Sequence, residues 1–175
     1  MRLDIHEENK QFVFFKPGQE EDKIDKPKVT KLMAWFAYNE AQSNLEPDDP
    51  AYDDAHAEYT YMEFPEHYTY NESAKEAHQK WRPRKRQSKD FVECIGRIHA
   101  VPRSSDDKYF LRMLLHHQRG SMSFSDLRTV EGVEHDTYKS AANALGLLSD
   151  DLEIVYALQD TYDFGSSAKL RSLSS

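Results

Sequence analysis

The stretch that decides the fold class is DDKYFLRMLLHH, which occupies residues 106–117. Its apolar residues recur three and four positions apart, and two further leucines widen the apolar face. This spacing predicts a helix that is buried on most of its sides. Asp106 or Asp107 would cap the first turn, and Gly120 would end the helix.

Before this helix the apolar residues alternate, as they do in strands. The pattern predicts short strands at 11–15 and 94–101, and two pairs of alternating tyrosines lie between residues 59 and 70. Trp81 follows these tyrosines across a polar gap, and that spacing suits an antiparallel ribbon. The expected sheet is therefore small and antiparallel.

Helical spacing also appears on both sides of these segments. A helix begins at about Thr30, and another follows Asp136 and closes near Gly146. A short turn is expected at 124–130 and a last helix over 150–162. The predicted fold class is α+β, with a small antiparallel sheet followed by a helical bundle. The residues expected in its core are Trp35, Phe36, Leu114, Leu145 and Leu148.

The composition limits the classes of protein that the chain can belong to. Its 175 residues suit about one domain. No stretch approaches the roughly 18 uncharged apolar residues of a membrane span, and the N-terminus lacks the apolar run of a signal peptide. The single cysteine, Cys94, excludes an internal disulfide. We therefore expect an intracellular protein, or a fragment of one.

The expected domain organisation follows from these patterns. One α+β domain lies between an N-terminal strand with a linker and a serine-rich tail. Its boundaries are 1–29 for the strand and linker, 30–163 for the domain with an acidic insertion at 40–58, and 164–175 for the tail.

Charge is segregated along the chain, although the net charge is −8. Residues 40–76 carry eleven acids and one lysine, whereas residues 80–89 carry six basic residues and no acid. Basic residues can neutralise DNA phosphates, and Trp81 could stack on an unpaired base or anchor the strand. The predicted DNA-contacting residues are Lys80, Trp81, Arg82, Arg84, Lys85 and Arg86. Two alternatives remain open, a nuclear localisation signal and a solvated hairpin strand.

Motifs for catalysis or for a metal are missing from the sequence. It contains no G-x-x-x-x-G-K-[ST] phosphate loop, no G-x-S-x-G and no H-E-x-x-H. His116 and His117 are adjacent, so we expect one to pack and the other to be solvated. The pair Asp150 and Asp151 is typical of a helix N-terminus. Cys94 is expected in the core. We expect no catalytic residue, metal or cofactor on this chain.

A resemblance to a known family rests on eight blocks that occur in the family's order. They are Thr30-x-Leu32-x-Ala34-Trp35-Phe36 with Asn39, Glu63-Phe64-Pro65-Glu66-His67-Tyr68, Lys80-Trp81 with Arg84, Ile95-Gly96-Arg97, Tyr109-x-Leu111-Arg112-x-Leu114-Leu115, Gly120-x-x-Ser123-Phe124-x-Asp126-Leu127-Arg128-Thr129-Val130-x-Gly132, Tyr138-Lys139-x-Ala141, and Ala144-Leu145-Gly146-Leu147-Leu148-x-Asp150-Asp151. On these residues the chain resembles the segment of Helitron transposon replicase-helicases that lies between the replication-initiator nuclease and the ATP-dependent DNA helicase motor.

The resemblance implies a part in rolling-circle replication without catalysis by this chain. The nuclease's His-hydrophobic-His pair and its two tyrosines three residues apart are absent, as is the motor's phosphate loop. We expect a nuclear, DNA-contacting connector domain, a remnant or fragment truncated before the motor. Its expected partners are DNA, with single-stranded DNA as one form, and a helicase or nuclease region, with no membrane.

Two other functions remain open. The chain could be part of an ATP-dependent DNA helicase whose motor lies on a longer product. Alternatively, it could be a captured protein-interaction module that uses the acidic insertion as its surface.

Overall fold

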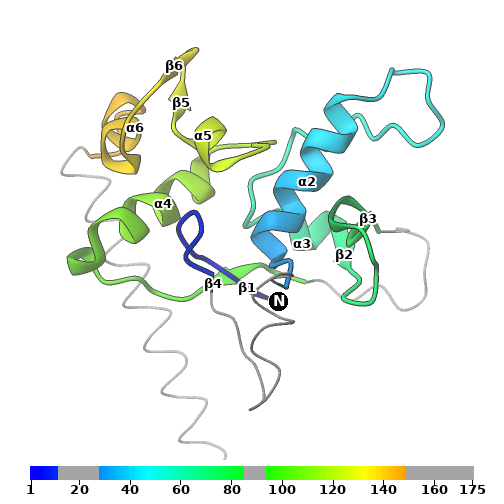
Figure 1. The fold of residues 1–175 in the computed structure, drawn as a ribbon, viewed down its shortest axis with the longest axis horizontal. Coiled ribbons are helices and arrows are strands. Elements are labelled where there is room, and N and C mark those ends of the chain that lie inside the picture. The colour runs from blue at the N-terminus through cyan, green and yellow to red at the C-terminus, as the bar shows by residue number, and fades with distance from the viewer. Residues whose placement is uncertain (12–27, 85–93, 149–175) are drawn as a thin grey trace, which may run out of the picture.

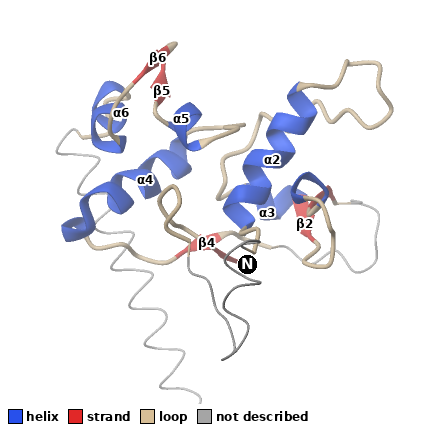
Figure 2. Cartoon of the chain, in the orientation of Figure 1, coloured by secondary structure: helices blue, strands red, loops and turns tan. Residues whose placement is uncertain are grey.

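The computed structural model describes residues 1–11, 28–84 and 94–148 (Figure 1). Within them the fold is α+β, as the sequence predicts, and its sheets are all two-stranded (Figure 2). The helices are α2 (Lys31–Ser43), α3 (Phe64–His67), α4 (Asp106–His117), α5 (Phe124–Leu127) and α6 (Tyr138–Ala144), with short 3-10 turns η1 (Ala77–Gln79) and η2 (Arg103–Ser105). The strands are β1 (Arg2–Leu3), β2 (Tyr68–Tyr70), β3 (Trp81–Pro83), β4 (Arg97–Ile98), β5 (Thr129–Val130) and β6 (Val133–Glu134).

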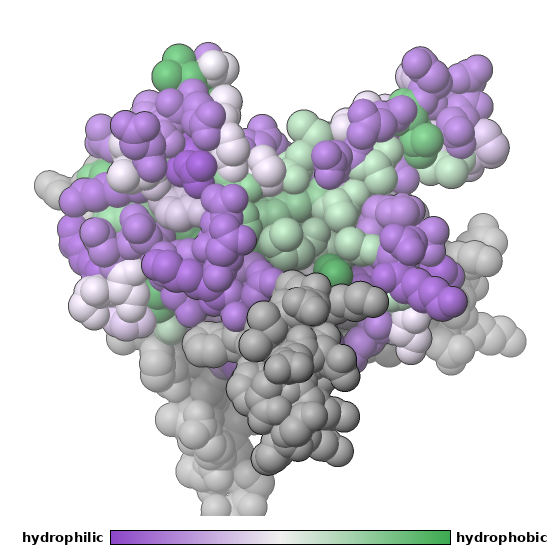
Figure 3. All heavy atoms as spheres, in the orientation of Figure 1, coloured by the Kyte–Doolittle hydropathy of each residue, from purple (hydrophilic) through white to green (hydrophobic). Residues whose placement is uncertain are grey.

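The elements form two groups that share one core. Figure 1 shows α2, α3, β2 and β3 on one side and α4, α5, β5, β6 and α6 on the other, with β1 and β4 beneath. Phe36 of α2 meets Phe124 of α5 edge to face, with ring centroids 5.0 Å apart, so the two groups are packed together. Polar residues cover the outer parts of the face drawn in Figure 3, and hydrophobic residues gather between the groups.

Helix α2 begins where the sequence predicts. The Thr30 side chain accepts a hydrogen bond from the backbone N–H of Met33, which is an N-cap contact. Trp35 and Phe36 are buried on the inner face, as predicted. Trp35 lies 5.4 Å from Tyr61, measured between ring centroids, so α2 joins an aromatic cluster.

Helix α4 confirms the prediction from residues 106–117, because seven consecutive residues, Tyr109 to Leu115, are buried. Leu114 is among them, as expected. The predicted end at Gly120 is wrong, since the helix ends at His117. Gly120 instead adopts a positive φ of 59° where the chain passes close to the backbone of Ala57.

The predicted strands are confirmed in part. Strands β2 and β3 form the expected antiparallel ribbon, with Tyr70 opposite Trp81. The predicted strand over 94–101 is reduced to Arg97–Ile98, and it pairs in parallel with β1, which the sequence did not predict. The tyrosines at 59–61 form no strand, although Thr60 makes an isolated bridge to Arg119. The predicted strand at 11–15 and the last helix over 150–162 lie outside the described residues, apart from Gln11.

The end of the described chain needs two corrections. Thr137, not Asp136, caps α6, and its side chain exchanges hydrogen bonds with Ser140 in a capping box. Gly146 closes the helix as predicted, with φ at 71° and a backbone bond to Asn143. Leu145 is 37% exposed, so its predicted burial is wrong. It occupies the C-cap position, and Leu147, two residues later, turns into the core.

The acidic segment is fixed to the body around Asp53. The Asp53 carboxylate accepts hydrogen bonds from the hydroxyls of Tyr38 and Tyr68, at 2.8 and 2.5 Å. His56 is buried and its Nδ1 lies 2.6 Å from the Asp53 carbonyl oxygen. Asp53 and His56 therefore give the acidic insertion a fixed place on the body.

Candidate nucleic-acid interface

The β2–β3 ribbon positions the predicted basic residues. Tyr70 is opposite Trp81, and Thr69 is opposite Arg82. Because neighbouring residues of a strand point to opposite faces, Trp81 is turned toward the core while Arg82 and Thr69 face solvent. Trp81 and Arg82, two of the predicted contact residues, therefore lie on opposite faces of the ribbon.

Trp81 anchors the ribbon. Its side chain is only 1% exposed and meets the ring of Phe64 edge to face, with centroids 5.3 Å apart. Its indole Nε1 donates to the backbone carbonyl of Lys31 at 3.2 Å. Of the two roles that the sequence left open, stacking on a base and anchoring the strand, this geometry gives Trp81 the second.

Lys80 is also directed inward, so the predicted phosphate contact does not suit it. The residue is 8% exposed, and its Nζ donates to the carbonyls of Glu72 and Ala74 at 2.9 and 2.7 Å. An ammonium group that holds two carbonyls closes the loop between the strands. Lys80 therefore acts within the fold and not on its surface.

Two further residues of the basic run, Arg82 and Arg84, lie within the described part of the chain. Arg82 is exposed. Arg84 is half-buried, and its Nε donates to the carbonyls of Pro65 and Tyr68 at 3.0 and 3.2 Å. Lys85 and Arg86 lie outside the described residues.

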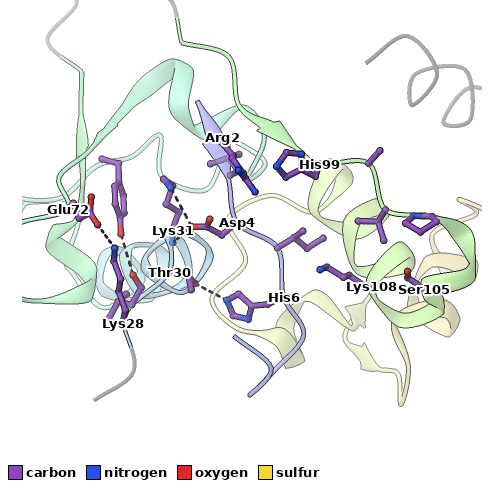
Figure 4. A pocket seen from close by; sticks show the side chains of 17 residues that line it. Arg2, Asp4, His6, Lys28, Thr30, Lys31, Glu72, His99, Ser105 and Lys108 are labelled. Atoms are coloured by element: carbon purple, nitrogen blue, oxygen red, sulfur yellow. Dashed lines mark hydrogen bonds and ion pairs between the residues drawn. The ribbon is translucent and has the colours of Figure 1, made fainter. Parts of the chain in front are cut away.

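The structure also shows a second cluster of basic residues, which the sequence did not predict. Arg2 and Arg97 occupy the same register in the parallel pair β1–β4, and both are exposed. The next residue on that side, His99, borders a cavity of about 520 Å³ together with Arg2 and Lys108 (Figure 4). No local pattern could have revealed this group, because the sequence brings residues 2 and 97 together only through folding.

The charges around this cavity are balanced at one end. Near the start of α2, Lys28 forms an ion pair with Glu72, and the Nζ of Lys31 lies 3.4 Å from the Asp4 carboxylate. Tyr70 borders this end, where burial and then the charge of Asp4 raise its pKa to about 12. At the other end, Arg2, His99 and Lys108 form no ion pair with another residue of the part of the chain that the structure describes.

The other candidates from the sequence show no such grouping. His116 is half-buried and His117 is the more exposed of the two, in line with one packed and one solvated ring, and partial burial of the His117 ring lowers its pKa. Cys94 is half-buried. Within residues 1–11, 28–84 and 94–148, no three acidic, histidine or cysteine side chains are placed to share a metal. Asp150 and Asp151 lie outside these ranges.

Two further findings bear on the class of protein. Across the described ranges, no helix has the length and apolar character needed to cross a membrane. Comparison of the chain with protein-family models and with curated proteins finds no match.

Proposed function

We propose that the chain is a non-catalytic DNA-contacting domain of Helitron type, which holds DNA between a nuclease and a helicase motor. The proposal is supported by the family-ordered sequence blocks and by the segregation of basic charge into residues 80–89. We also propose that it acts in the nucleus, where its DNA partner would be.

The observation that carries the proposal is that hydrogen bonds hold the β2–β3 ribbon in place while one of its basic side chains is exposed. Trp81 and Arg84 fasten the ribbon to the body through hydrogen bonds to the carbonyls of Lys31 and Pro65, and Lys80 closes its loop. The same ribbon exposes Arg82. A basic side chain on a fixed strand contacts phosphate without the entropy cost of ordering a flexible segment.

The expected binding is weak and tolerant of sequence, because contacts to phosphate carry no base information. Arg82, Lys85 and Arg86 supply three contacts in this proposal. Each contact on single-stranded DNA contributes about −0.7 to the slope of log K against log salt, so the expected slope is about −2.

Binding of labelled oligothymidylate to the full chain across a salt series tests the proposal. Arg82→Gln should flatten the slope by about 0.7, and Arg82→Gln with Arg86→Gln by about 1.4. Lys75→Gln is the matched control, since Lys75 is exposed but lies outside the basic run. Wild-type protein without salt-dependent binding at low ionic strength would contradict the proposal.

A second measurement addresses the non-catalytic part of the proposal. The pure chain should show no ATP hydrolysis above background, with or without single-stranded DNA. Turnover stimulated by DNA would instead favour the helicase alternative. A chain that binds no DNA but captures a defined protein would favour the interaction module.

A further inference from the structure

The parallel pair β1–β4 places two like charges side by side. Arg2 and Arg97 are partners in the register, and Leu3 and Ile98, the next pair along, are buried. Both arginines therefore extend from the exposed face of the same two-stranded sheet. Like charges directly opposite one another destabilise a sheet, so this arrangement favours the presence of a negative charge between or beside them.

Two more basic side chains surround the same place. His99 follows β4 on the face of Arg97, and Lys108 extends from the first turn of α4 (Figure 4). Arg2, His99 and Lys108 all border the cavity. Arg2 belongs to β1, His99 to the segment after β4, and Lys108 to α4, so only the folded chain assembles them.

The rest of the cavity restricts where an anion can bind. Asp4, which lies near Arg2 (Figure 4), and Glu72 also line the cavity, and each is already paired with a lysine, Asp4 with Lys31 and Glu72 with Lys28. These pairs offset the charge of the two carboxylates, whereas Arg2, His99 and Lys108 have no carboxylate partner among the described residues. The volume of about 520 Å³ falls within the range of small-molecule sites, roughly 300–1,000 Å³.

We propose that the part of the cavity bordered by Arg2, His99 and Lys108 binds the phosphate group of a nucleotide. The guanidinium of Arg2 would bind two phosphate oxygens with its fork of N–H donors, and Lys108 would supply a point charge from the opposite wall. The sugar and base would lie against the apolar lining, which includes Ile5, Val101 and Pro102. The phosphate comes either from a free nucleotide or from the end of a DNA strand.

This site goes beyond the proposed function, because it uses none of the basic residues 80–86. The two ideas can therefore fail separately. Arg82→Gln tests the salt dependence of binding to a long strand, whereas substitutions at Arg2 and Lys108 test dependence on a phosphate in the cavity.

Calorimetry on the full chain provides the test, with four probes. They are thymidine 5′-monophosphate, thymidine, and a short oligothymidylate with and without a 5′-phosphate. The phosphorylated member of at least one pair should bind more tightly than its partner. Preference within the nucleotide pair assigns the phosphate to a free nucleotide, and preference only within the oligonucleotide pair assigns it to a strand end. Arg2→Gln and Lys108→Gln should each weaken that binding about tenfold, and Lys75→Gln should leave it unchanged.

Arg97→Gln separates binding from folding. It removes one of two opposed like charges, so the unliganded variant should have an unfolding midpoint at or above that of the wild type. The same variant should gain less stabilisation from the phosphorylated probe than the wild type does. No preference for phosphate in either pair, or a preference that both Arg2→Gln and Lys108→Gln leave intact, would overturn the proposal.

Discussion

Trp81 fills the contact between the ribbon and α3, and its indole is tied to the start of α2. Trp81→Ala should lower the free energy of unfolding by about 3–5 kcal/mol, because it leaves a large cavity and removes the hydrogen bond from the indole to the Lys31 carbonyl. Urea denaturation followed by circular dichroism measures this loss. Trp81→Phe, which keeps a ring against Phe64, should cost less.

The same variant distinguishes the two roles of Trp81. Oligonucleotide affinity, corrected for the folded fraction, should be that of the wild type, since the indole is buried. A Trp81→Ala chain with unchanged stability and weaker DNA binding would show that the indole contacts a base.

Asp53 holds the hydroxyls of Tyr38 and Tyr68 in their neutral form. Burial, and after it the hydrogen bond to the Asp53 carboxylate, raises the pKa of both tyrosines well above the ordinary value near 10. The unfolded chain releases these protons from about pH 10, whereas the folded chain retains them. Stability from this source is therefore complete below pH 10 and falls as the pH rises further.

We expect the urea midpoint to fall between pH 9 and pH 11.5, and tyrosinate absorbance to show that Tyr38 and Tyr68 do not ionise before unfolding. Asp53→Asn removes the negative charge, so both hydroxyls should ionise at lower pH than in the wild type. Equal titration in the two proteins would rule out the carboxylate as a cause of the raised pKa.

Strand β4 begins at a close approach of two backbones. A Cβ at Gly96 would collide with the carbonyl of Met62 and lie 2.9 Å from Leu3 Cδ1. Gly146 has a positive φ of 71° but open space around it. Gly96→Ala should therefore displace β4 and lower stability more than Gly146→Ala, which should cost about 1–2 kcal/mol for the left-handed conformation alone.

Thermal unfolding of the two glycine variants, side by side, checks this order. Gly96→Ala should also expose the amide protons of β1 and β4 to hydrogen exchange, because the pairing depends on that close approach. If Gly146→Ala were the more damaging change, the β1–β4 contact would contribute little to the fold.

The elements that the sequence predicted are those with a local signal. Helices α2 and α4 show helical spacing over twelve or more residues, and Thr30 supplies a cap next to the first turn. Strand β1 has no such signal, because two residues are too few to show alternation, and its pairing with β4 could not be predicted because the partner is remote in sequence. The error at Asp136 is a shift of one residue between two good capping residues. That same uncertainty at helix ends explains the exposed Leu145.

For the candidate site, the sequence predicted which residues are basic but not which surface they occupy. The sequence shows that basic residues gather at 80–89, but the direction of each side chain depends on the face of the ribbon that the core occupies. That core is aromatic, so Trp81 turns inward and Lys80 is drawn to the loop carbonyls. The cavity with Arg2 and Lys108 follows from tertiary packing and had no signal in the sequence.

The acidic segment is held at Asp53 and His56 but not at its tip. Residues 45–50 form local turns, such as the hydrogen bond from the Asp49 N–H to the Glu46 carbonyl. Within residues 28–84, limited digestion with a protease that cleaves before aspartate should therefore cut first at Asp48 or Asp49, since Asp48 is exposed. Mass spectrometry of the early fragments identifies the site. First cleavage before Asp53, whose carboxylate is held by Tyr38 and Tyr68, would contradict this arrangement.

The pairing of Arg2 with Arg97 also sets an order of events during synthesis. Strand β1 leaves the ribosome first, yet its partner is made 95 residues later. At about 5–20 residues per second, Leu3 waits roughly 5–20 seconds for Ile98. Helix α2 and the ribbon, whose contacts are closer in sequence, can form in that interval. Strand β1 then pairs only after these elements have formed, and until then chaperones and neighbouring chains can bind it.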